Sequence, residues 1–182
     1  HNFVQRWNEA SERSRPDGSW ACDPEDRLPF PAVLSTARGA SVVQIQRMLE
    51  PGRYHDGRAA PEAPARNVAD GERSVLEQYE RAIDAARRTI YIENQAIPVP
   101  EMADHLERAL ARGVAVALLV PAIPEPYVYD ARRDPTQRAR FDRLAALARY
   151  PGFLLAGVAE GKGAARRPVY VHCKLMVVDD VW

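Results

Sequence analysis

The chain has 182 residues, 46% of them hydrophobic, which is enough to bury a core in a single domain. Its 25 basic residues balance 25 acidic ones, and this zero net charge argues against a strongly basic nucleic-acid binder. No apolar run approaches the roughly 18 residues that a membrane span requires, and 2 cysteines make no disulfide framework.

The amino-terminal part alternates two regular segments with two proline-rich ones. Apolar residues at helical spacing predict a helix over 2–13, and a Val- and Ile-rich run predicts a strand over 41–48. Segments 14–36 and 51–70 are rich in Pro and Gly and are predicted to be loops.

Helices and strands then alternate to the end of the sequence. The helices are predicted over 72–88, 101–112 and 135–149, and the strands over 89–93, 114–120, 153–158 and 169–178. The nearly continuous apolar run 114–120 is typical of a strand covered on both faces. This repetition predicts one α/β domain over 1–182 around a largely parallel sheet, and the last strand is expected to add an antiparallel partner.

Ligands of such sheets bind beyond the carboxyl ends of the strands. The sequence places three segments there: 94–100, 121–134 and the turn after Val178. Glu93, Asn94 and Gln95 are polar residues at the end of a buried strand, which predicts that they bind substrate or cap the next turn. Which of the three side chains points inward is left open.

The last strand places two reactive side chains next to each other. Residues two apart share a face of a strand, so His172 and Lys174 share one with Tyr170. A lysine on an otherwise apolar ridge calls for an anion, unless it is a strand-end lysine whose stem lies along apolar surface. Cys173 falls on the opposite, apolar face and is predicted to be a small core residue.

Three segments together resemble the phospholipase D superfamily. The spacing of His172, Lys174 and Asp179 is similar to the HxKxxxxD signature, the run from Ile90 to Gln95 is similar to its I-Y-I-E-N-Q segment, and Phe3 to Asn8 resembles its F-x-x-R-W-N. The resemblance implies a phospholipase D-like sandwich, with helices on both faces of a mixed sheet. It also implies that the chain is a fragment, the C-terminal half of a two-motif enzyme.

This resemblance implies a phosphodiesterase that works through a phosphohistidine, with His172, Lys174 and Asp179 as catalytic residues and with no metal and no cofactor. His172 would be the general acid/base, because an imidazole exchanges protons near neutral pH. Lys174 would balance the phosphoryl charge. Asp179, five residues after Lys174, is expected to hold a turn or orient the histidine, and Asp180 is its rival for that duty.

The partners implied are a phospholipid at a membrane surface and the first HxKxxxxD half, from the same chain or a second copy. No nucleic acid is expected, and the location implied is peripheral at a membrane. The alternatives are a nuclease of the same superfamily and a non-catalytic interaction half. A metal site of His172, Cys173, Asp179 and Asp180 is disfavoured, since His172 and Cys173 point to opposite faces.

Overall fold

The computed structural model describes residues 2–9, 28–29, 31, 36, 38–51, 70–96 and 100–180. Residue contacts divide the chain into two compact units, His1–Glu77 and Gln78–Trp182. One domain is expected over 1–182 from the sequence, whereas the predicted α/β sheet lies within the second unit.

In the first unit, helix α1 (Asn2–Glu9) confirms the predicted helix as far as residue 9, and residues 10–13 lie outside the described part. Phe3 and Trp7, one turn apart on α1, stack their rings with centroids 6.0 Å apart. Most of both predicted loops, 14–36 and 51–70, also lies outside the described residues.

The predicted strand 41–48 is wrong for most of its length. Strand β1 (Met48–Leu49) makes a two-residue antiparallel pair with β2 (Glu72–Arg73), and residues 41–47 join no ladder. The apolar side chains that suggested the strand, such as Val43 and Ile45, are exposed. A β-rich composition without a partner surface to cover it therefore gave a misleading signal here.

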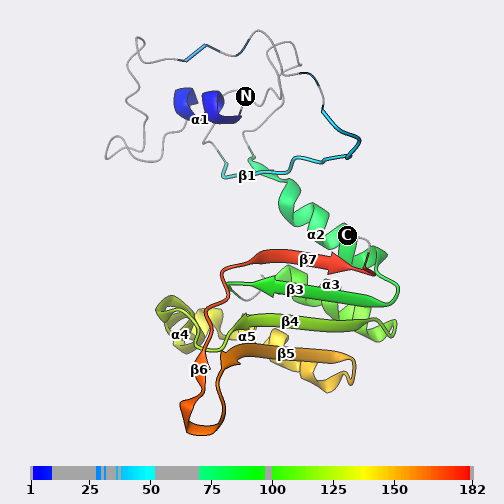
Figure 1. Ribbon diagram of the computed structural model, residues 1–182, viewed down its shortest axis with the longest axis vertical. Coiled ribbons are helices and arrows are strands. Elements are labelled where there is room, and N and C mark those ends of the chain that lie inside the picture. Colours follow the sequence, from blue (N-terminus) through cyan, green and yellow to red (C-terminus); the bar gives the residue numbers. More distant parts are fainter. Residues whose placement is uncertain are drawn as a thin grey trace. The chain divides into compact units, whose positions relative to one another are not determined.

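The second unit is built on a five-stranded sheet with the order β6-β5-β4-β3-β7 (Figure 1). Its strands are β3 (Thr89–Asn94), β4 (Ala115–Pro121), β5 (Phe153–Glu160), β6 (Arg167–Pro168) and β7 (Lys174–Val178). The three central strands are parallel, and the two edge strands, β6 and β7, are antiparallel to their neighbours. The mixed α/β sheet flanked by helices confirms the predicted fold class.

The helices follow the predicted pattern with shifted ends. They are α2 (Ser74–Ala85), α3 (Pro100–Ala111), α4 (Pro126–Arg133) and α5 (Pro135–Ala146), with short 3-10 turns at Leu147–Arg149 and Gly163–Ala165. Gly113 ends the α3 segment with φ of 89°, a conformation that suits glycine. The segment predicted as loop up to residue 134 contains all of α4. Pro126 and Pro135 sit in the first turns of α4 and α5, where a missing N–H costs no helical hydrogen bond.

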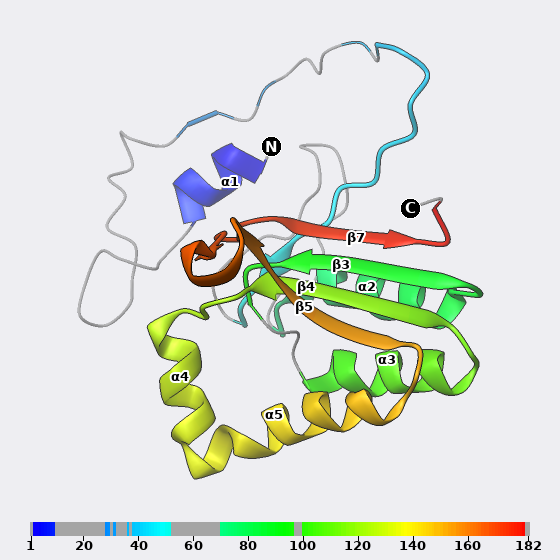
Figure 2. The ribbon, with the colours of Figure 1, turned by 60° about the horizontal axis from the view of Figure 1, so that its bottom comes forward.

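Within the second unit, the helices lie on one face of the sheet. Helices α3 and α5 lie side by side on that face (Figure 2), and there Ile90 and Ile92 are buried with Val116 and Leu118 from β4. On the other face Tyr91, Leu154 and Leu175 are 37%, 57% and 41% exposed.

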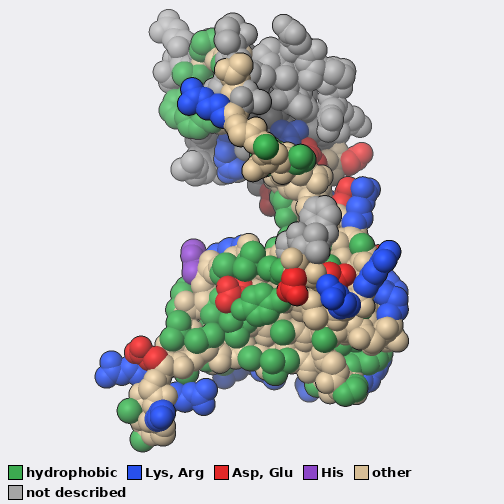
Figure 3. All heavy atoms as spheres, turned by 45° about the vertical axis from the view of Figure 1, so that its right-hand side comes forward, with side chains coloured by type: hydrophobic (Ala, Val, Ile, Leu, Met, Phe, Trp, Pro, Cys, Tyr) green, Lys and Arg blue, Asp and Glu red, His purple; other side chains and the backbone are tan. Residues whose placement is uncertain are grey.

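Figure 3 shows hydrophobic side chains gathered on the strand side of this unit, with a few acidic ones among them. Among the described residues of this unit, the helices do not form the second layer that the resemblance implies. Strand β4 is buried at Val116 and Leu118 on the helix side and half-buried at Ala117 and Leu119 on the other, so the predicted covering of 114–120 on both faces is only partly found in the described part of the chain.

The last strand is shorter than predicted and fixes the geometry of the site. Residues 169–173 are extended but make no ladder, and Cys173 in this stretch is exposed, so its prediction as a core residue is wrong. The predicted antiparallel direction of β7 is confirmed, with Lys174 opposite Asn94 and Val178 opposite Ile90. The turn after Val178 consequently lies at the amino end of β3, not at the carboxyl end where the sequence analysis placed it.

Candidate active site

Lys174 begins β7 and lies opposite Asn94, the last residue of β3. Its Nζ donates to Oε1 of Gln95 at 2.8 Å and to the backbone oxygen of His172 at 3.0 Å. An ammonium group has three N–H donors. Within the described part of the chain, one donor of Lys174 therefore remains for an anion that approaches from solvent.

His172 lies in the extended stretch that leads into β7, and its side chain is exposed. The imidazole stacks on the ring of Tyr170, with centroids 5.9 Å apart and planes inclined by 22°. Among the described residues its ring nitrogens make no hydrogen bond. Both nitrogens can therefore meet a substrate.

The antiparallel direction of β7 brings this pair to the open end of the sheet. Lys174 lies at the carboxyl end of β3, which runs parallel to β4. This is the edge at which ligands of open α/β sheets bind. The histidine and the lysine reach it from the start of an antiparallel strand, while Gln95 reaches it from the end of a parallel one.

The three polar residues at the end of β3 make different contacts, and Gln95 lies just beyond the last residue of the strand. Gln95 turns to Lys174, as described above, and Asn94 accepts from the backbone N–H of Ala96 at 3.4 Å. Glu93 lies opposite Leu175 on the other face of the sheet, where its carboxylate accepts from the Tyr91 hydroxyl at 2.8 Å. The structure thus brings Gln95 to the pair and directs Glu93 away from it.

Two further residues belong to this cluster and were not singled out from the sequence. The Tyr170 hydroxyl accepts from Nε2 of Gln95 at 2.7 Å and donates to the Glu125 carboxylate. Tyr170 carried a signal, because it precedes His172 by two residues and so shares its face. Glu125 carried none, since it lies between two prolines in a segment predicted as loop.

Asp179 lies at the opposite end of β7 and binds backbone. Its carboxylate accepts from the N–H groups of Arg87 at 2.9 Å, Arg88 at 2.7 Å and Thr89 at 2.9 Å. These hydrogen bonds, the one from Thr89 foremost, lower the pKa of Asp179 from its ordinary 3.8 because they favour the charged form. Asp179 therefore fastens β7 to the turn between α2 and β3, and the structure does not bring it to His172.

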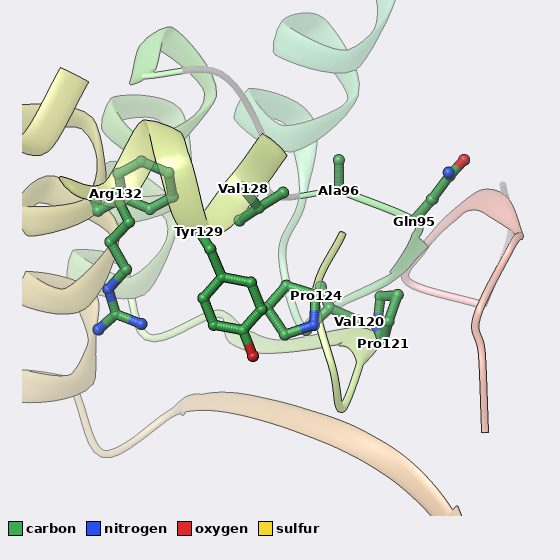
Figure 4. A pocket seen from close by; sticks show the side chains of 9 residues that line it. Gln95, Ala96, Val120, Pro121, Pro124, Val128, Tyr129 and Arg132 are labelled. Carbon is green, nitrogen blue, oxygen red and sulfur yellow. The ribbon is translucent and has the colours of Figure 1, made fainter. Parts of the chain in front are cut away.

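A hollow of about 190 Å³ lies on the other side of Gln95, at the carboxyl ends of β3 and β4. Its walls are mostly apolar, with one guanidinium; they are formed by Gln95, Ala96, Val120, Pro121, Pro124, Val128, Tyr129, Arg132 and Phe141. Figure 4 shows the amide of Gln95 turned away from Val128 and Tyr129. Gln95 therefore separates the hollow from Lys174, contributing to each on a different side.

The described residues contain no group of three or more His, Cys, Asp or Glu side chains that could hold a metal ion. His172, Cys173, Asp179 and Asp180, the set considered from the sequence, are thus not assembled into such a group. Nor is any described helix both long enough and apolar enough to cross a membrane.

Comparison with known proteins finds a family model and solved structures to which this chain is similar. Residues 79–182 match the family model described as "Cardiolipin synthase, PLD-like domain". NucT from Helicobacter pylori is similar in structure at 17% identity, with a TM-score of 0.41 and coverage of 58% of this chain and 60% of that one. Nuc from Salmonella typhimurium, a phospholipase D family member, is similar at 20% identity, with a TM-score of 0.39 and 58% of each chain covered. No curated protein matches the chain.

Proposed function

Because the chain belongs to the phospholipase D-like family, a family of phosphodiesterases, we propose that it cleaves phospholipids by the phospholipase D reaction. The products are a phosphatidyl group, passed to water or to an alcohol, and the released head-group alcohol. The match includes His172, Lys174 and Asp179, the three residues of the HxKxxxxD spacing.

The observation that carries this proposal is the pairing of His172 and Lys174 at the open end of the sheet. Lys174 is held by Gln95 and by the His172 backbone, with one N–H donor to spare. A phosphodiester carries one negative charge, and its non-bridging oxygens can accept that donor. The cation then stabilises the charge that collects on these oxygens in the transition state.

His172 is proposed to move the protons. In the first step a histidine of the other HxKxxxxD motif attacks phosphorus, the bond from phosphorus to the head-group oxygen breaks, and His172 donates a proton to that oxygen. In the second step His172 takes a proton from water or an alcohol, whose oxygen attacks the phosphohistidine. The phosphatidyl product leaves, and both imidazoles return to their starting forms.

The proposal requires the partners that the sequence analysis predicted. One is the other HxKxxxxD half, supplied by the same polypeptide or by a second copy, and the other is a membrane surface that presents the lipid. The chain spans about three-fifths of the length of the two solved structures named above.

The roles of the remaining candidates follow from their contacts. Gln95 is proposed to set the position of Lys174, and Asn94 to shape the end of β3 beside it. For Asp179 we propose a structural role, since its carboxylate is engaged by three backbone N–H groups. Glu93, which binds Tyr91 on the other face, is proposed not to contact the substrate that Lys174 binds.

The test is to incubate the full-length protein with phosphatidylcholine vesicles and ethanol. Release of choline together with formation of phosphatidylethanol is expected, because a covalent phosphatidyl intermediate partitions between water and ethanol. Cleavage of a single-stranded or double-stranded oligonucleotide, with no lipid product, would instead support a nuclease. A folded protein that binds vesicles and cleaves neither substrate would support the non-catalytic reading.

A further inference from the structure

Asp179 does not orient the His172 imidazole, so another contact must hold the ring in place. A catalytic histidine is commonly oriented by a hydrogen bond to its second ring nitrogen. Within the described residues no such bond is made, and the Asp179 carboxylate is taken up by backbone N–H groups at the far end of β7. The contact that does bear on the imidazole is the stacked ring of Tyr170.

A directed chain of hydrogen bonds fixes Tyr170 in turn. Lys174 can only donate, so the Gln95 oxygen must face it and the Gln95 NH₂ group must face Tyr170. The Tyr170 oxygen accepts from that NH₂ group, and its O–H therefore points to the Glu125 carboxylate. The chain runs from a cation to an anion with every donor and acceptor in one sense, an arrangement in which neighbouring hydrogen bonds strengthen each other.

We propose that Tyr170 is a positioning residue for His172, whose imidazole it holds by ring stacking while Gln95 and Glu125 hold its hydroxyl. Because His172 is a catalytic residue only in the proposed phosphodiesterase, the consequence for turnover rests on that proposed function. The positioning of the His172 imidazole by the Tyr170 ring does not depend on the proposed function. Tyr170 thereby links three segments: the stretch before β7, the end of β3, and Glu125 at the N-cap of α4.

The same contacts keep Tyr170 in the form that the chain requires. The hydrogen bond with Glu125 raises the pKa of the Tyr170 phenol above its ordinary 10.0, because it favours the protonated form. Tyr170 is 51% exposed, so shortening its side chain opens no cavity in the core. Its substitution is thus a local test and leaves the sheet in place.

The decisive measurement is the NMR signal of His172 in full-length protein labelled at histidine and assigned with a His172→Asn variant. Tyr170→Leu removes the stacked ring, and the His172 ring-proton signals should move because the ring-current shift is lost. Tyr170→Phe keeps the ring and should leave those signals close to their wild-type positions. This measurement needs no turnover, so it decides the geometric part even if no phosphodiester is cleaved.

Kinetics test the consequence for the reaction. Tyr170→Leu is expected to lower kcat about 10- to 100-fold with KM little changed, since a misplaced acid/base group slows the chemical step. Tyr170→Phe should lose less, because it gives up the hydroxyl chain but keeps the ring. The matched control is Tyr150→Phe, which also removes a tyrosine–glutamate hydrogen bond, to Glu107 on α3, away from β7.

The expected pattern is a shifted His172 signal and a reduced kcat in Tyr170→Leu, a nearly unshifted signal and a smaller loss of kcat in Tyr170→Phe, and neither change in Tyr150→Phe. A wild-type His172 signal in Tyr170→Leu would overturn the proposal. So would equal losses of kcat in Tyr170→Leu and Tyr150→Phe that follow their melting temperatures, since these would mean a general loss of stability.

Discussion

The two ends of β7 use their polar side chains in opposite ways. At its start, His172 and Lys174 are exposed, and Lys174 is bound through side-chain and backbone oxygens that leave it a donor for a ligand. At its end, Asp179 gives its carboxylate to three N–H groups of one turn and receives a fourth contact through its own N–H, which donates to the Thr89 oxygen at 2.9 Å. The start of β7 is therefore open to solvent and to a ligand, whereas its end is bound to the backbone of residues 87–89.

The difference shows that the residues of the HxKxxxxD spacing do not all serve the same purpose. Lys174 and Asp179 are five residues apart on a strand that rises ~3.4 Å per residue, which separates their Cα atoms by about 17 Å. No side chain spans that distance, so the two cannot act on one phosphate. The five-residue spacing between Lys174 and Asp179 corresponds instead to the length of β7. The residues proposed to act in catalysis lie at its start, and Asp179 anchors its end to the backbone.

The largest effect of a substitution is expected at the start of β7. His172→Ala in the full-length protein is expected to lower kcat by at least ~10³-fold in the phosphatidylcholine assay, because it removes the group proposed to move both protons. Its thermal midpoint should match that of the wild type, since the imidazole is exposed. Turnover of this variant at the wild-type rate would show that His172 does not act in the proposed reaction, and it would contradict a catalytic role for the start of β7.

The strands β3, β4 and β5 and helix α3 could be predicted from sequence because their apolar residues follow the period of each element. In α3, Met102, Leu106 and Leu110 recur at helical spacing, and all three are buried. The direction of β7 was also predicted. The positions of these strands and of α3 depend on local pattern, which a single sequence displays, whereas the direction of β7 depends on its pairing with β3.

Other features depend on contacts that the sequence does not display. The Val- and Ile-rich segment 41–47 pairs with no strand in the described part of the chain, and the alternating residues 169–173 come before the ladder, which begins only at Lys174. Tyr170 was placed on the correct face, yet its partner Glu125 lies 45 residues away in sequence. A hydrogen bond between residues so far apart in sequence depends on the fold, so neither spacing nor composition could predict it.

The end of β7 is tested by a pair of isosteric substitutions. Asp179→Asn replaces one carboxylate oxygen with an NH₂ group that would face a backbone N–H, and it should lower the thermal midpoint by about 5 °C. Asp180→Asn removes the same charge from the neighbouring residue, which also has positive φ, 58° against 53°. It should leave the midpoint within about 1 °C of the wild type.

Calorimetry of both variants, with kcat measured on the folded protein, separates the two roles. Asp179→Asn is expected to keep most of its kcat below its lowered melting temperature. A loss of kcat comparable to that of His172→Ala, with an unchanged midpoint, would show that Asp179 acts in the chemistry and would break the division between the two ends.

The smallest expected effect is the dependence of this fastening on pH. The backbone N–H groups of Thr89 and Arg87 lower the pKa of folded Asp179 below 3.8. A carboxylate whose pKa is lower in the folded state stabilises the fold fully above its unfolded pKa, and this stabilisation is lost as the pH falls through the folded value. The gap in thermal midpoint between Asp180→Asn and Asp179→Asn should therefore be constant above about pH 5 and shrink towards pH 3 and below. The two variants carry equal net charge, so the general effect of acid on the other carboxylates cancels in the difference. A gap that stays the same down to pH 2 would mean that the carboxylate charge does not contribute to the fastening of β7.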